Sequence, residues 1–314
     1  MSSLMRAELL RLVSRRLLIV LLVCVAALAA FGSAVSADGA RPLTAQDRRD
    51  AQQSFVSDRQ YWQEECATGA SASQEVCQGW EAPTNFEDYL RTPIGFGLYT
   101  EGVVGFGLPI VLLAVAVMAA SLVGAEFSSG NVGTQLLFTP RRVPLFISKV
   151  VAAAVGGLLV AVAHLGTSLG FSAIMFLSLR GADDMTAGIE LPMALGRALV
   201  LAVLIAVMAG ALAMAVGSTL ITAGIFAVTL LGSVMAGDAI SGSSLLQVLL
   251  PGNILFAMLD GRHEIFDYQA QVYEAEPLLA HVINYDWALG YSVAGTAMIL
   301  VVSAWWFHRR DILR

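Results

Sequence analysis

Long apolar stretches alternate with shorter polar segments along the 314-residue chain. A helix that crosses a membrane needs about 20 mostly apolar residues. Four stretches reach that length: residues 17–37, 103–125, 145–179 and 287–307. A fifth stretch, residues 193–237, carries a single charge and is long enough for two helices with a turn near Gly217. The pattern therefore predicts an all-α membrane protein with six transmembrane helices.

A shorter apolar stretch, residues 245–259, is interrupted by Pro251 and Gly252. Apolar segments clearly shorter than a full crossing are more often re-entrant or interfacial than spanning. We therefore predict a re-entrant segment before the last span, within a polar region that covers residues 238–286. The resulting even number of spans leaves both termini on the same side of the membrane.

Composition supports a membrane location, because 57% of the residues are hydrophobic and only 13% are charged, against about 25% charged in soluble domains. Residues 1–16, 126–149 and 308–314 together carry 10 of the 18 basic and 3 of the 24 acidic residues, a net charge of +7. The remaining segments, including the long loop 38–100, carry −13. Because cytoplasmic segments are rich in Lys and Arg, we predict a multi-pass plasma-membrane protein with both termini in the cytoplasm.

The N-terminal segment has two features that each leave an alternative open. Residues 1–16 space leucines and arginines as in an amphipathic helix on the cytoplasmic membrane surface, although an ordinary basic flank explains the charges equally well. The 21 apolar residues of 17–37 exceed the hydrophobic region of a signal peptide, which has about 7–15 residues. This length favours an uncleaved anchor over a cleaved signal peptide.

The long external loop contains two of the three cysteines, Cys66 and Cys77. Compartments outside the cytoplasm favour oxidation of paired thiols. We therefore predict a disulfide between these two residues, with two free thiols as the alternative.

Residues needed for chemistry within this chain are few. A P-loop requires a Gly-Lys pair followed by Ser or Thr, but Lys149, the only lysine against 17 arginines, lies between Ser148 and Val150. The sequence thus predicts no ATPase activity for this chain. No two histidines are spaced four residues apart and no Cys-x-x-Cys is present, so we predict no metal site. We also predict no catalytic residue, cofactor or nucleic-acid partner. The arginine excess is typical of a GC-rich bacterial genome.

The ionisable residue His164 lies near the middle of a predicted span. Such residues are costly in the bilayer and often functional, so His164 is a candidate pathway or interface residue, as is Pro251 in the re-entrant segment. A neutral histidine bonded to a neighbouring helix is the alternative, and we favour it because imidazole can be neutral near pH 7.

A characteristic polar segment follows the second predicted span. It runs from a glutamate through glycine, threonine and a leucine pair to proline, two arginines and a downstream lysine: Glu126, Gly130, Thr134, Leu136, Leu137, Pro140, Arg141, Arg142 and Lys149. This segment resembles the coupling region of the permease subunits of type-2 ABC transporters, an exporter class with six spans per subunit. The surface helix at the N-terminus and the broken segment before the last span also resemble that family.

The resemblance implies a function that the residues alone do not establish. By this resemblance, residues 126–144 form a cytoplasmic coupling helix that docks on separate P-loop ATPase subunits, which bind ATP and Mg. A second permease copy or a paralogue completes a pathway for a lipid, drug or peptide-like substrate, in contact with membrane lipids. A membrane sensor or structural protein that uses the external loop, and a secondary carrier, are the alternatives.

Overall fold

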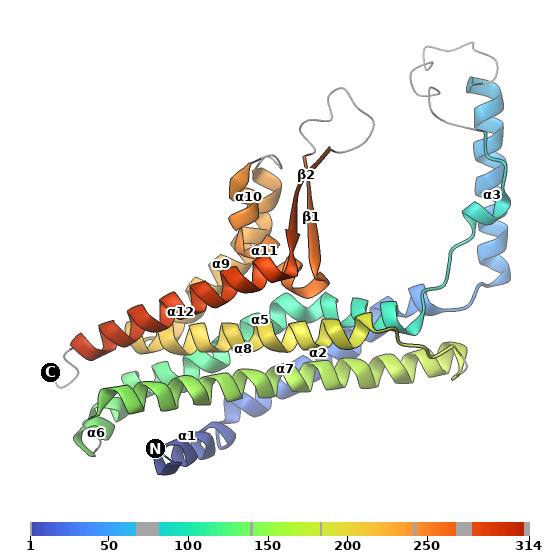
Figure 1. The fold of residues 1–314 in the computed structure, drawn as a ribbon. Coiled ribbons are helices and arrows are strands. Elements are labelled where there is room, and N and C mark those ends of the chain that lie inside the picture. Colours follow the sequence, from blue (N-terminus) through green and yellow to red (C-terminus); the bar gives the residue numbers. More distant parts are fainter. Residues whose placement is uncertain are drawn as a thin grey trace.

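A computed structural model describes residues 2–66, 82–138, 141–182, 184–240, 244–267 and 278–310. Helices dominate this part of the chain, as predicted (Figure 1). The elements are α1 (Ser2–Val13), α2 (Arg16–Ala40), α3 (Ala45–Tyr61), η1 (Trp62–Cys66), η2 (Phe86–Tyr89), α5 (Phe96–Ser128), α6 (Asn131–Phe138), α7 (Arg142–Arg180), α8 (Glu190–Val216), α9 (Thr219–Ala239), α10 (Leu245–Leu249), α11 (Pro251–Asp260), β1 (Arg262–Asp267), β2 (Leu278–Asn284) and α12 (Tyr285–Arg309).

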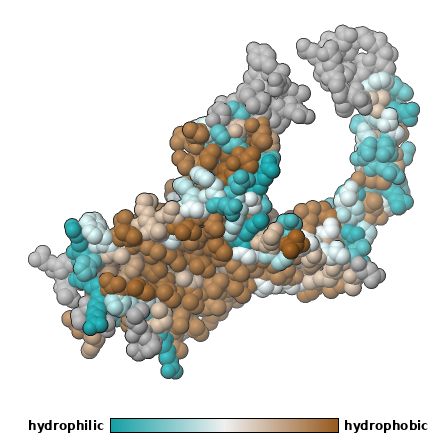
Figure 2. Space-filling view, viewed as in Figure 1, coloured by the Kyte–Doolittle hydropathy of each residue, from teal (hydrophilic) through white to brown (hydrophobic). Residues whose placement is uncertain are grey.

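Within the described residues, five helices are long and apolar enough to cross a membrane: α2, α5, α7, α8 and α12. The other predicted span coincides with α9, whose described apolar part, Thr219–Ser233, is shorter than these five helices. The structure therefore supports five candidate spans, with one shorter apolar helix at the position of the remaining predicted span. Figure 2 shows hydrophobic side chains over most of the visible bundle surface, as expected for helices that contact lipid.

A two-stranded antiparallel hairpin, formed by β1 and β2, lies within the predicted polar region 238–286 and adds a small sheet to the otherwise helical fold. Ile265 on β1 and Ile283 on β2 are buried, and the hairpin packs against α11. Apolar residues do not alternate strictly with polar ones in these two short segments, so their sequence lacks the pattern of a half-buried strand.

Small residues allow α7 and α8 to approach each other closely. A methyl group added at Gly157 on α7 would lie 2.4 Å from Cβ of Ala206 on α8, and one at Gly210 would lie 2.7 Å from Cβ of Ala153. Both helices thus present small residues four positions apart at their contact, an arrangement that is common between membrane helices.

We predict that Gly157→Ala lowers the free energy of unfolding by about 1–3 kcal/mol, because the added methyl group overpacks the contact with Ala206. Gly166→Ala on the same helix is the matched control, since its Cβ would meet nothing within 4 Å, and alanine is the better helix former. Thermal unfolding of both variants in detergent checks this. Equal stability of the two would contradict the close α7–α8 contact.

Helix α3 stands away from the bundle and begins with a capping box (Figure 1). The Thr44 hydroxyl accepts from the backbone N–H of Asp47, and the Asp47 carboxylate accepts from the backbone N–H of Thr44. The Arg41 guanidinium also donates to both Asp47 oxygens, at 2.7 and 2.8 Å. These contacts, first among them the Arg41 hydrogen bond, hold the pKa of Asp47 well below its usual value of 3.8.

The capping interactions give a pH-dependent prediction for α3. Because the folded-state pKa of Asp47 is lowered, its stabilising contribution is present above pH 3.8 and is lost as the pH falls below that value. Hydrogen exchange of residues 45–61, corrected for intrinsic rates, should accelerate more on acidification below pH 3.8 in the wild type than in Asp47→Asn. An equal acceleration in both proteins would exclude this role of the carboxylate.

Helix α5 occupies the centre of the bundle and packs against α2, α7, α8 and α9. Both termini lie at one end of the bundle, together with α1, α6 and the last turn of α12 (Figure 1). We call this the N/C end, and the opposite end, where α5 and α8 begin, the loop end. Helix α7 has 39 residues, and at 1.5 Å per residue it is about 58 Å long, so it connects the two ends.

Candidate functional site

The predicted coupling segment lies at the N/C end, between α5 and α7. Helix α5 stops at Ser128, and Gly130 then adopts a positive φ of 72°, a conformation that suits glycine because it lacks a Cβ. This turn reverses the chain into the eight-residue helix α6. The short helix therefore bridges the ends of two long helices of the bundle.

A buried charge cluster lies directly behind α6. Lys149 on α7 is 0% exposed, and its ammonium group donates to the Glu126 carboxylate on α5 and, at 3.2 Å, to the Glu8 carboxylate on α1. Glu8 is also 0% exposed, and Glu126 is 4% exposed. One lysine thus joins three helices through two carboxylates that are excluded from solvent.

Two arginines and a glutamine complete this cluster. Gln135 on α6 donates to Glu126 at 3.1 Å, Arg11 pairs with Glu8 at 2.9 Å, and Arg15 lies 3.8 Å from Glu126. Burial lowers the pKa of Arg15, whereas the nearby Glu126 and Glu8 carboxylates oppose that shift. We refer to Glu8, Arg11, Arg15, Glu126, Gln135 and Lys149 as the charge cluster.

A second set of contacts ties the start of α7 to the end of α12. Nη1 of Arg142 lies 2.7–3.2 Å from the carbonyl oxygens of Phe307, His308 and Arg310. Carbonyls at a helix C-terminus lack intrahelical donors, so this guanidinium satisfies them. Arg310 in turn donates to the Ala215 carbonyl on α8 at 3.1 Å. Arg142 and Arg310 therefore join α7, α8 and α12 at the N/C end.

The C-terminal tip of α6 is apolar and exposed within the described residues. Leu137 is 70% exposed and Phe138 is 84% exposed. Beside Phe138, a groove of about 520 Å³ separates α6 from the end of α1 and the two residues that follow it, with Arg11, Thr134 and Phe138 among its lining residues. The helix thus offers an apolar tip next to a groove that contains a basic side chain.

The predicted coupling residues fall into an outward and an inward set. Gly130, Thr134 and Arg141 are exposed, and Arg142 is half-buried against α12. The side chains of Glu126 and Lys149 are buried and face each other, so they do not form part of the exposed surface.

Several predicted residues lie outside the part of the chain that the structure describes. They are Pro140, Cys77 and the side chain of Cys66.

Two further predicted residues occupy distinct positions in the bundle. His164 is fully buried, with Nε2 3.4 Å from the Val104 carbonyl oxygen on α5. Pro251 is the first residue of α11 and follows the break that separates this helix from α10, a position that suits proline because its missing N–H is not needed there. Both residues lie apart from the charge cluster.

Glu8, Arg11, Arg15 and Gln135 belong to the charge cluster, although the sequence motif does not include them. Glu8 lies 141 positions before its partner Lys149, so their spacing gives no indication of contact. The one available signal is that Glu8 is the only acidic residue among the four arginines of residues 1–16. A single carboxylate in a basic segment is a reason to search for a buried lysine or arginine side chain that pairs with it.

Among the described residues, no group of three or more His, Cys, Asp or Glu side chains is arranged to hold a metal ion. Comparison of the chain with protein-family models, curated proteins and solved structures finds no match. What the protein does is therefore inferred from its own residues and their geometry.

Proposed function

We propose that this chain is the membrane-spanning permease subunit of an ATP-driven exporter of the type-2 ABC class. It forms a pathway for a lipid, drug or peptide-like substrate, works with a second copy or a paralogue, and receives energy from separate P-loop ATPase subunits in the cytoplasm. The N/C end then faces the cytoplasm, in agreement with the net charge of +7 on its segments.

One observation carries this proposal: a short helix with an apolar tip lies directly on a buried charge cluster that joins three helices. Leu137 and Phe138 are available to a soluble partner, since large exposed apolar side chains next to polar ones often mark interaction sites. Gln135, on the inward side of the same helix, donates to Glu126. A displacement of α6 by a partner is thereby transmitted to the bundle.

One route leads from α6 into the bundle through the Gln135–Glu126 hydrogen bond, and a second set of contacts begins at α7, the next helix along the chain. The first runs through Glu126 and Lys149 to α5, α7 and α1. The second runs from Arg142, at the start of α7, to the last turn of α12. Because packed elements shift between discrete arrangements rather than deform continuously, closure of the ATPase subunits on α6 would switch these helices together.

Co-purification from the native host tests the proposal. The full-length tagged chain is extracted in mild detergent or native nanodiscs, and the proteins bound to it are identified by mass spectrometry. We expect a P-loop ATPase in near-stoichiometric amount, with ATP hydrolysis by the complex that requires its Walker lysine. Recovery of the folded chain without any P-loop protein would contradict the proposal, as would substrate transport in liposomes that contain this chain alone and no ATP.

A further inference from the structure

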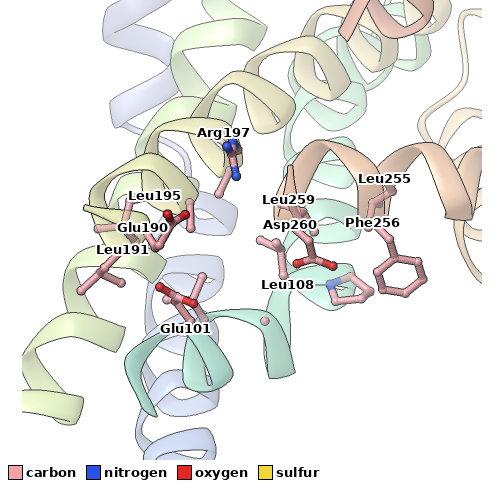
Figure 3. A pocket seen from close by; sticks show the side chains of 15 residues that line it. Glu101, Leu108, Glu190, Leu191, Leu195, Arg197, Leu255, Phe256, Leu259 and Asp260 are labelled. Atoms are coloured by element: carbon pink, nitrogen blue, oxygen red, sulfur yellow. The ribbon is translucent and has the colours of Figure 1, made fainter. Parts of the chain in front are cut away.

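A cavity of about 320 Å³ opens at the loop end of the bundle, between α5, α8 and α11. This cavity is separate from the charge cluster, and none of its lining residues belongs to the predicted coupling segment. Much of its wall is apolar, with contributions from Leu108, Leu195, Leu255 and Leu259. Phe256 adds an aromatic ring (Figure 3). The cavity can therefore hold an apolar body of moderate size.

Three carboxylates, one from each of the three helices, border this cavity: Glu101, Glu190 and Asp260. Glu190 and Asp260 both lie within electrostatic reach of Glu101, and Figure 3 shows the three groups around the same space. None of them forms an ion pair within the part of the chain that the structure describes. The three carboxylates thus have no ion-pair partner that would offset their mutual repulsion.

The single basic residue of the cavity, Arg197, attracts Asp260 electrostatically, but it forms no ion pair with any of the three carboxylates in the described part of the chain. Its guanidinium carbon lies 5.2 Å from the centre of the Tyr285 ring, and its nitrogens lie against the backbone of Gly261. Burial lowers the pKa of the neighbouring His263, which favours the uncharged imidazole. The formal charges of the lining side chains, three carboxylates and one guanidinium, thus sum to −2.

The backbone adds a further acceptor. Pro109 lies inside α5 and has no N–H, so the carbonyl of Gly105, one turn earlier, lacks its helical donor. Both residues line the cavity. Carboxylates and a freed carbonyl favour a ligand that carries positive charge and hydrogen-bond donors. Because no described carboxylate group is arranged to ligate a single metal ion, a larger organic cation fits better.

We propose that this cavity binds a lipophilic organic cation, with its apolar body against the leucine and Phe256 wall and its positive charge among Glu101, Glu190 and Asp260. Attraction to three carboxylates provides the selectivity for charge. Only the identification of this ligand class as an exported substrate rests on the proposed function; binding itself does not require the ATPase.

A pair of probes with the same shape and opposite charge tests this inference. Tetraphenylphosphonium and tetraphenylborate are compared by equilibrium dialysis against the full-length chain in nanodiscs of zwitterionic lipid, with empty nanodiscs as the blank. We expect saturable binding of the cation and none of the anion above the blank. Equal binding of both ions, or binding of the cation no greater than in empty nanodiscs, would overturn the inference.

Variants then locate the site. Glu101→Gln, Glu190→Gln and Asp260→Asn should each weaken cation binding by about tenfold, because each removes one attractive charge. Glu190 is exposed at the first residue of α8, so its variant is the least able to disturb folding. Glu87→Gln, which removes an exposed charge from η2, is the matched control and should leave binding unchanged. Cation binding that is insensitive to all three variants would place the ligand elsewhere.

The outcomes separate this inference from the proposed function. Selective cation binding by a chain that has no P-loop partner would support the cavity and contradict export. A P-loop partner without selective cation binding would support export and overturn the ligand class.

Discussion

Lys149→Met should lower the free energy of unfolding by about 3–5 kcal/mol, the usual cost of removing one partner from a buried ion pair. Lys149 is fully buried, and its ammonium group is the contact that Glu126 and Glu8 share. Without it, the two carboxylates face each other in a region that excludes water, with only the peripheral arginines to balance them. Reversible unfolding in mixed micelles measures the change.

Two further variants show whether the loss arises from unpaired charge. Lys149→Met combined with Glu126→Gln should be more stable than Lys149→Met alone, because the double change removes one of the carboxylates left unpaired. Ser148→Ala changes the adjacent buried residue, whose hydroxyl bonds only within α7, and should cost about 1 kcal/mol or less. If Lys149→Met were as mild as Ser148→Ala, the charge cluster would not be a buried network.

Leu137→Glu combined with Phe138→Glu should reduce the amount of co-purified ATPase at least tenfold while the melting temperature of the chain stays within a few degrees of the wild type. Both side chains are mostly exposed, so folding does not depend on them, whereas two carboxylates in an apolar contact carry a large desolvation cost. Quantitative mass spectrometry of the purified complex measures the loss.

A matched control for the α6 variant lies on α3. Val56 is 42% exposed and belongs to the loop predicted to lie outside the cell, so Val56→Glu introduces the same chemistry away from the proposed contact. The ATPase should co-purify with this variant at the wild-type level. Retention of the ATPase by the α6 variant would mean that the partner binds another surface.

The apolar pattern predicts most of the helices because length and hydrophobicity are local properties. The turn expected near Gly217 falls where α8 ends and α9 begins, and Gly217 adopts a positive φ of 75°, which its sequence context already favours. The hairpin is different. Its strands are separated by 10 residues, so no short turn signal marks it, and its apolar positions become meaningful only when α11 packs against them.

The site could be predicted only in part, because its most important contacts are distant in sequence. The motif includes Glu126 and Lys149 and suggests that they contact an ATPase subunit. In the structure, packing of α1 and α7 buries both side chains. Glu8 comes from the other end of the chain, and no spacing rule connects it with Lys149. The same holds for Glu101, Glu190 and Asp260, which three separate helices bring to one cavity.

The central claim is that α6 contacts an ATPase, and site-specific photo-crosslinking at Leu137 tests it most directly. A photoreactive phenylalanine analogue is placed at this position in the native host, with a second variant labelled at Val56 as the control. We predict an ultraviolet-dependent adduct of the chain with a P-loop protein from position 137 and none from position 56. Adducts from position 137 that contain only lipid, or a protein without a P-loop, would contradict the account.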